Sequence, residues 1–331
     1  MHAVDVKSLA IYTPPHFMNT PTSHAFPVSS VRTALFSLIM LALLSGATCI
    51  LAQSDAQPVN PLPMPAVTVT ATNDLSEETL IGPNQQPEWT TRRRFAITRI
   101  YVQPPWQAET EFGWDAVYPR GGSPQHVLQQ EIELGLPYRF QVDYEIHGAN
   151  FEEGTTGGGR WHYASSEFEL RWALADWGKI PLNPTLKVEW KINGDGTDAA
   201  EANLLLGDEL APRWHWGSDL FYEQAVNGDR RTEKAVSLAV SYSVIDEKLG
   251  IGMETKLDSE NDVDDRHAHL NLELGPSVQW RLTSRLHLDL ESLFGVTGFA
   301  PHVETFVFMG YDFGPGSEPG EGVRPISLET K

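Results

Sequence analysis

The sequence is poor in cysteine and in basic residues. A single cysteine, Cys49, occurs in 331 residues, which excludes a framework of internal disulfides. Lysine and arginine number 24 against 44 aspartates and glutamates, so the formal net charge is −20. Nucleic-acid binding needs a basic surface that neutralises phosphates, and this chain does not offer one. We therefore expect no nucleic-acid partner.

Long apolar runs are equally scarce. The sequence has one, at residues 33–52, where Arg32 precedes an apolar core of signal-peptide length and the small residues Ser45, Gly46 and Ala47 follow it. We predict a signal peptide over residues 1–52 that is removed on export, which leaves the mature chain without cysteine. An uncleaved membrane anchor is the alternative, because twenty residues are enough to span a bilayer.

Two segments show no hydrophobic period. Residues 53–105 are predicted to be a disordered periplasmic lead-in, since residues 53–90 are rich in Pro, Asn and Gln. Within the lead-in, three consecutive arginines at residues 92–94 precede a short apolar stretch at 95–102, for which a periplasmic strand and a plug segment both remain open. Residues 314–331 are rich in Gly, Pro and Glu and are predicted to form a disordered tail.

From residue 106 the sequence alternates strictly between apolar and polar positions. In WQAETEFGWDAVY, Phe112, Trp114 and Tyr118 share one face, whereas Glu109 and Glu111 share the other. A period of two residues indicates a β-strand. With a tilt of about 40°, such a strand crosses the apolar layer of an outer membrane, with lipid outside and water inside.

The same pattern recurs about twelve times between residues 106 and 313. Polar, Gly-rich loops alternate with mostly short turns, as they do in outer-membrane barrels. The fold class predicted is all-β, a transmembrane antiparallel β-barrel of about twelve strands, located in the bacterial outer membrane, with both ends in the periplasm. A soluble β-sandwich also alternates, but its strands are usually shorter, about five or six residues.

The last strand, FVFMGYDF, ends at Phe313 and is similar to the C-terminal signal that the barrel-assembly machinery reads. A resemblance to a known family rests on the arginine-rich lead-in, the strand WQAETEFGW, the turn ADWGKIP at residues 175–181 and this aromatic final strand. In these segments the chain resembles bacterial outer-membrane barrels described as transporter-like proteins of phenol-degradation pathways. The resemblance covers residues 90–313 and implies a barrel that passes small molecules.

The inward face is strongly acidic, which predicts a pore that prefers cations. The alternative is a closed lumen in which carboxylates and basic side chains brace one another. The predicted pore-lining residues are Glu109, Glu111, Asp115, Glu131, Glu133, Arg139, Asp143, Glu145, Glu167, Glu169, Arg171, Lys187, Glu189 and Lys191.

The sequence predicts no enzyme, cofactor or metal site. It has no nucleophile elbow, phosphate-binding glycine loop or H-E-x-x-H helix. The acidic loop at residues 258–269, with His267 and His269, lacks the spacing of a calcium loop and a third histidine. The predicted function is passive passage of small solutes, with outer-membrane lipid as the surroundings. The alternatives are an adhesive barrel acting through external loops such as residues 148–164, and a lipid-modifying enzyme.

Overall fold

The computed structural model describes residues 75–95, 99–151, 160–228, 231–261, 269–314 and 324–325. The following lie outside the described residues: the predicted signal peptide, residues 53–74 and 96–98 of the predicted lead-in, residues 262–268 of the acidic loop with His267, and most of the predicted tail. No helix in the described part of the chain is long and apolar enough to cross a membrane.

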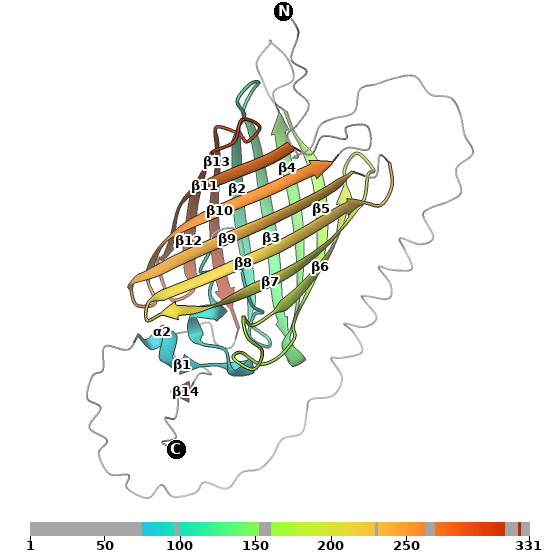
Figure 1. Cartoon of the computed structure of the whole chain (residues 1–331). Coiled ribbons are helices and arrows are strands. Elements are labelled where there is room, and N and C mark those ends of the chain that lie inside the picture. Colours follow the sequence, from blue (N-terminus) through green and yellow to red (C-terminus); the bar gives the residue numbers. More distant parts are fainter. Residues whose placement is uncertain are drawn as a thin grey trace, which may run out of the picture. The chain divides into compact units, whose positions relative to one another are not determined.

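Twelve antiparallel strands close into a barrel, which confirms the predicted fold class (Figure 1). Each strand pairs with its neighbours in sequence, and the first pairs with the last, from Val303↔Tyr118 to Phe313↔Ala108. The strands are β2 (Ala108–Tyr118), β3 (Gln125–Leu136), β4 (Phe140–Phe151), β5 (Arg160–Ala173), β6 (Thr185–Asn193), β7 (Ala199–Ala211), β8 (Trp214–Ala225), β9 (Thr232–Ile245), β10 (Leu249–Asn261), β11 (His269–Arg281), β12 (Leu286–Gly295) and β13 (Val303–Phe313).

Alternation along each strand separates the two surfaces of the barrel. On β2, the side chain of Phe112 is 51% exposed on the outside, whereas Glu109 is 1% exposed on the inside. Leu204, Leu205 and Leu206 break the apolar–polar alternation of the sequence, but on β7 the alternation of inward and outward side chains continues, with Leu205 buried on the inward face. A buried leucine on an otherwise polar inner face explains why the sequence signal is weakest there.

The outer surface carries an apolar belt bounded by aromatic side chains. Exposed aliphatic residues such as Ile132, Val188 and Met253 cover the middle of the strands. A soluble monomer rarely exposes an apolar patch above about 600 Å². Exposed aromatic residues lie near the strand ends: Tyr118, Trp161 and Tyr222 at one end of the barrel, and Trp172, Trp214, Trp280 and Tyr311 at the other. This arrangement fits lipid around the barrel and headgroups at both rims.

The connections differ between the two ends of the barrel. At one end they are mostly very short, as at residues 212–213 and 246–248, where Arg213 and Glu247 adopt positive φ. The exception at this end is the longer turn at residues 174–184. The opposite end carries the loops at 119–124, 194–198, 226–231 and 296–302. Short turns face the periplasm in outer-membrane barrels, so the loops lie outside the cell.

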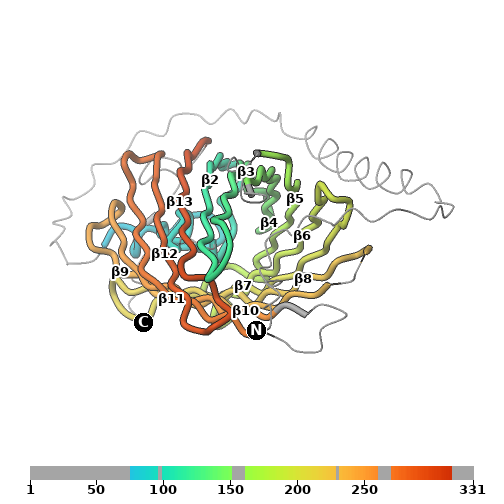
Figure 2. Tube along the Cα trace, turned by 90° about the horizontal axis from the view of Figure 1, so that it is seen from above, coloured from blue at the N-terminus to red at the C-terminus, as the bar shows by residue number. Residues whose placement is uncertain are grey.

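Residues 75–95 and 99–105, called the plug below, close the periplasmic end of the barrel. They contain α2 (Ser76–Thr79), β1 (Leu80–Ile81) and the 3₁₀ turns η2 (Pro83–Gln85) and η3 (Glu88–Thr91). Trp89, Phe95 and Ile100 pack against the inner wall, whereas α2 and β1 lie at the rim (Figure 1). Figure 2 shows this segment in cyan within the ring of strands. β1 also pairs with β14 (Arg324–Pro325). The prediction of a disordered lead-in was wrong for these residues, because the barrel wall supplies the apolar and charged partners that they lack locally.

Candidate functional site

Thirteen of the fourteen predicted pore-lining residues lie on inward faces, while Arg139 does not. Strands β2 to β6 present these thirteen to the lumen: Glu109, Glu111, Asp115, Glu131, Glu133, Asp143, Glu145, Glu167, Glu169, Arg171, Lys187, Glu189 and Lys191. Arg139 lies in the turn η4 (Pro137–Arg139), with a φ of 68°. Its Nη1 is 3.1 Å from Oδ1 of Asp176 in the next periplasmic turn. The strand was predicted to include Arg139, but the chain is still turning there.

Basic side chains on β5 and β6 neutralise much of the acidic wall beside them. The Nζ atom of Lys187 lies 2.8 Å from Glu169, 3.1 Å from Glu189 and 3.1 Å from Glu201. Arg171 pairs with Glu169 and, at 3.5 Å, with Asp143. On this side of the lumen, carboxylates and basic side chains therefore pair with one another, as the alternative of a closed lumen predicted.

The plug fills the periplasmic end with aromatic side chains. Trp89, Phe95 and Ile100 form a buried cluster with Ala239 of β9. Trp177, from the long periplasmic turn, meets Trp89 edge-on with ring centroids 5.4 Å apart. Trp177 meets Tyr101 in the same way at 5.3 Å. Edge-to-face aromatic pairs at these distances are favourable, so the turn and the plug stabilise each other.

Two plug arginines connect it to the acidic wall of β2 and β3. Arg93 pairs with Glu111, whereas Arg99 pairs with Glu109 and, through Nε at 3.1 Å, with Glu133. Burial alone would lower the pKa of both guanidinium groups, but the neighbouring carboxylates outweigh it and raise the pKa of each. Both arginines therefore stay charged. The run of arginines at residues 92–94 is evident in the sequence, but no local pattern predicts which carboxylates these side chains meet.

A second set of contacts holds α2 against the periplasmic rim. Glu77 lies 2.6 Å from Nη2 of Arg94 and accepts a hydrogen bond from Ser243 of β9. Burial alone would raise the pKa of Glu77, but the charge of Arg94 and the hydrogen bonds from Ser243 and the backbone N–H of Glu247 lower it. Glu77 is thus held as a buried carboxylate at neutral pH.

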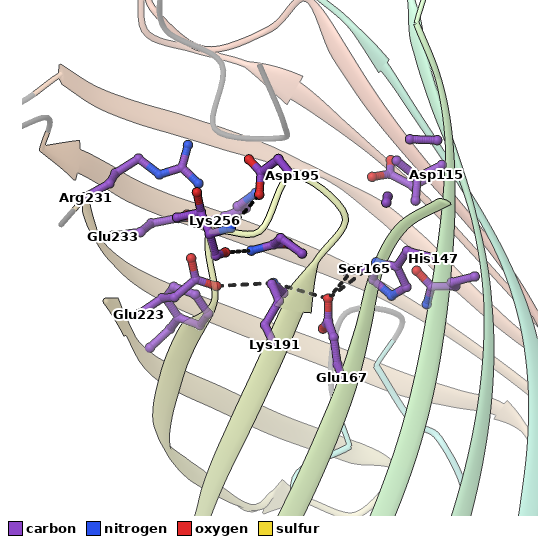
Figure 3. Close-up of a pocket in the computed structure, with 17 residues that line it drawn as sticks. Asp115, His147, Ser165, Glu167, Lys191, Asp195, Glu223, Arg231, Glu233 and Lys256 are labelled. Carbon is purple, nitrogen blue, oxygen red and sulfur yellow. Dashed lines mark hydrogen bonds and ion pairs between the residues drawn. The ribbon is translucent and has the colours of Figure 1, made fainter. Parts of the chain in front are cut away.

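Two cavities lie in the lumen on the extracellular side of the plug. The outer cavity measures about 330 Å³ and is lined by residues near the loop end, including Asp195, Lys191 and Arg231 (Figure 3). The inner cavity measures about 300 Å³, and Arg93 and Arg99 of the plug line it. Both cavities share four lining residues, Asp115, Phe221, Glu233 and Lys256, so they meet at that level.

Several lining residues were missing from the predicted set. Glu201 and Glu223 are buried on the inward faces of β7 and β8, and the same alternation that revealed the earlier strands applies to them. Phe221 is an aromatic residue on an inward face, which no polar-inside pattern predicts. Asp195 comes from a turn, whose orientation a strand pattern cannot give.

Two clusters in the described residues bring three possible metal ligands together. Glu109, Glu111 and His287 form one, and Glu145, His147 and Glu167 form the other; within each, one ligand atom per residue lies within 4.8 Å of the others. In the first cluster, Arg99 and Arg93 pair with the two glutamates, which leaves little negative charge for an ion. The second cluster lies beside the outer cavity.

The closed barrel, its apolar belt and its charged lumen define an outer-membrane β-barrel, which belongs in the bacterial outer membrane. No protein-family model matches the sequence, and no curated protein matches it significantly. Solved structures with a similar arrangement include the NanC porin, at 14% identity and a TM-score of 0.44, covering 62% of this chain and 99% of that one.

Two further solved structures have comparable similarity. An outer membrane channel from Pseudomonas putida F1 has 10% identity and a TM-score of 0.47, covering 65% of this chain and 98% of that one. The KdgM porin in complex with disordered oligogalacturonate has 7% identity and a TM-score of 0.40, covering 62% and 98%. Because every score lies below 0.5, these similarities support no statement about what this barrel carries.

Proposed function

We propose that the barrel is a passive channel for small solutes, with the plug as its closed periplasmic gate. The observation that carries this proposal is the pair of adjoining cavities inside the lumen, whose lining is mostly charged and polar. A barrel that served only as a scaffold would gain more stability from filling this space. The sequence resemblance to transporter-like barrels of phenol-degradation pathways is a second support.

The open channel prefers cations in this proposal. The inner cavity is lined by seven carboxylates, those of Asp115, Glu131, Glu133, Glu201, Asp219, Glu233 and Glu304. Five basic residues face them, and two of these, Arg93 and Arg99, belong to the plug. Movement of the plug therefore removes positive charge and leaves an acidic excess, which concentrates cations in a narrow lumen.

Single-channel recording in a planar bilayer under a salt gradient tests the proposal. Two forms are compared, the mature chain from residue 53 and a form that lacks residues 53–105. We expect discrete conductance steps in the shortened form, with a reversal potential that favours cations, and mostly closed records in the longer form.

Three outcomes are informative. Silence from shortened barrels that are folded and inserted would refute passage through the lumen. Anion preference would refute the acidic-lumen argument alone. Equal conductance in the two forms would refute the role of the plug as a gate.

A further inference from the structure

His147 stands on an irregularity of the barrel wall. The pairing of β4 with β5 shifts register between His147 and Gly148. Such β-bulges are common beside functional sites. The imidazole of His147 lines the outer cavity with Ser165, Glu167 and Lys191, as Figure 3 shows. The extra residue of the bulge is Ala164 on β5, whereas His147 continues the inward alternation of Asp143 and Glu145 on β4. Its imidazole therefore faces the part of the lumen nearest the outside.

The two ring nitrogens of His147 face two different carboxylates. Nε2 lies 2.6 Å from Oε1 of Glu145, whereas Nδ1 lies 3.6 Å from Oε1 of Glu167. Nε2 has no hydrogen-bond partner among the described residues, so the shorter contact is an ion pair whose attraction holds the ring beside Glu145. The longer one exceeds hydrogen-bond distance, so the Nδ1 atom and the Glu167 oxygen face each other across a gap.

The width of this gap suits a bound ion. A zinc ion binds histidine nitrogen at about 2.0–2.1 Å and carboxylate oxygen at about 2.0–2.2 Å. At a near-tetrahedral angle, two such bonds place nitrogen and oxygen about 3.4 Å apart. The observed 3.6 Å therefore needs only a small adjustment of either side chain. Imidazole with carboxylate selects zinc, copper or nickel over calcium and magnesium, which prefer oxygen ligands alone.

A further carboxylate, that of Asp115, lines the same cavity with one oxygen atom that has no hydrogen-bond partner among the described residues. Asp115 is 8% exposed, and its Oδ1 atom has no hydrogen-bond partner among the described residues. It lines the outer cavity together with His147. Burial of a carboxyl oxygen without a hydrogen-bond partner destabilises the fold, and a cation bound in this cavity would give that oxygen a partner.

The ammonium group of Lys191 competes with a metal ion for Oε1 of Glu167. Its Nζ atom lies 3.4 Å from Oε1 of Glu167, which also accepts a hydrogen bond from Ser165 at 2.8 Å. Lys191 has a second carboxylate, that of Glu223, at 3.2 Å. It can therefore give up Glu167 and keep an ion pair, which leaves Glu167 available as a ligand.

We propose that Glu145, His147 and Glu167 form a binding site for one divalent transition-metal ion in the wall of the outer cavity. The ion lies between Nδ1 of His147 and the carboxylate of Glu167, Glu145 orients the imidazole, and Asp115 offers an unpartnered carboxyl oxygen to the same cavity. The site requires only an accessible outer cavity, so it stands whether or not the lumen conducts.

Calorimetric titration of the folded mature chain in detergent tests the site, with Zn²⁺ as the probe and Mg²⁺ as the comparison. We expect one Zn²⁺ per barrel and no comparable heat with Mg²⁺. His147→Gln should remove this binding, and Glu145→Gln should weaken it about 10- to 100-fold. Lys191→Met should tighten it, because the competing cation is gone.

His126→Gln is the matched control, since His126 stacks on Trp114 with ring centroids 5.8 Å apart and lies away from this cavity. It should bind Zn²⁺ as the parent chain does. Unchanged Zn²⁺ binding in His147→Gln, or no binding by the parent chain, would overturn the proposal. If His147→Gln fails to fold, Glu167→Gln serves instead, with the same expected loss. Because the readout is heat and not current, a silent channel leaves the result intact.

Discussion

At the scale of single residues, the plug depends on buried charges that have specific partners. Arg93 and Glu111 are both less than a tenth exposed and pair only across the plug–wall boundary in the described residues. Arg93→Met leaves Glu111 without this partner, and loss of one member of a buried pair costs about 3–5 kcal/mol. We expect release of the plug to become easier by that amount, measured as faster amide hydrogen exchange at residues 88–95.

The control for this substitution is a double variant. Arg93→Met with Glu111→Gln removes both charges and should recover much of the lost protection, because no unpaired buried charge remains. Equal loss in the single and double variants would show that Arg93 acts through packing, for instance through its contact with the ring of Phe308 at 4.4 Å.

Glu77 makes the attachment of the plug depend on pH. Because its pKa is lowered in the folded state, it contributes stability above its ordinary value of 4.5, and this is lost as pH falls below that value. We expect the protection of amides at residues 76–79, taken relative to their intrinsic exchange rates, to fall as the pH drops from about 4.5 to about 3. Glu77→Gln should exchange faster at neutral pH and show a flatter profile. Profiles of the same shape in both proteins would assign the effect to other carboxylates.

At the scale of elements, the sequence predicted the strands, whose pattern repeats, but it did not predict the fold of the plug, which has no repeating pattern. The alternation of Phe112 with Glu111 is local, so it identified β2 and, repeated, the whole barrel. The plug has no period, because Trp89, Phe95 and Tyr101 are buried by the wall and by Trp177, far away in the sequence. Those contacts exist only once the barrel has closed, so no local pattern encodes them.

Glycines on β7 and β8 make room for the plug at one place on the wall. Gly207 and Gly217 are opposite each other, and a Cβ on Gly217 would lie 2.6 Å from Ile100 and 2.7 Å from Phe95. Gly217→Ala should therefore displace the plug at a cost of about 1–3 kcal/mol while the strands still pair. Amide exchange across the plug and across β8 measures the two effects separately.

Gly148→Ala is the matched control, since the atom nearest to its added Cβ, the carbonyl oxygen of His162, is 3.7 Å away. It should leave exchange in the plug unchanged. Loss of protection throughout β8 in Gly217→Ala would mean that the glycine is needed for strand pairing in the barrel, and not to leave room for the plug.

At the scale of the whole molecule, the lumen is asymmetric along its axis. The periplasmic end is packed with the plug and the turn at residues 174–184, whereas the opposite end holds the outer cavity and the longer loops. A solute arriving from outside would meet charged cavities first and the packed segment last. A gate at the periplasmic end is therefore open to control from the periplasm.

This orientation can be tested in intact cells, because Cys49 is the sole cysteine of the chain. In a Cys49→Ser background, Gly298→Cys lies in the loop between β12 and β13, where an added Cβ meets nothing within 4 Å. Lys179→Cys lies in the turn between β5 and β6, where Lys179 is exposed. A membrane-impermeant maleimide should label the first variant in intact cells and the second only after the outer membrane is permeabilised. The reverse order of labelling would place the plug at the cell surface and would make it an external lid.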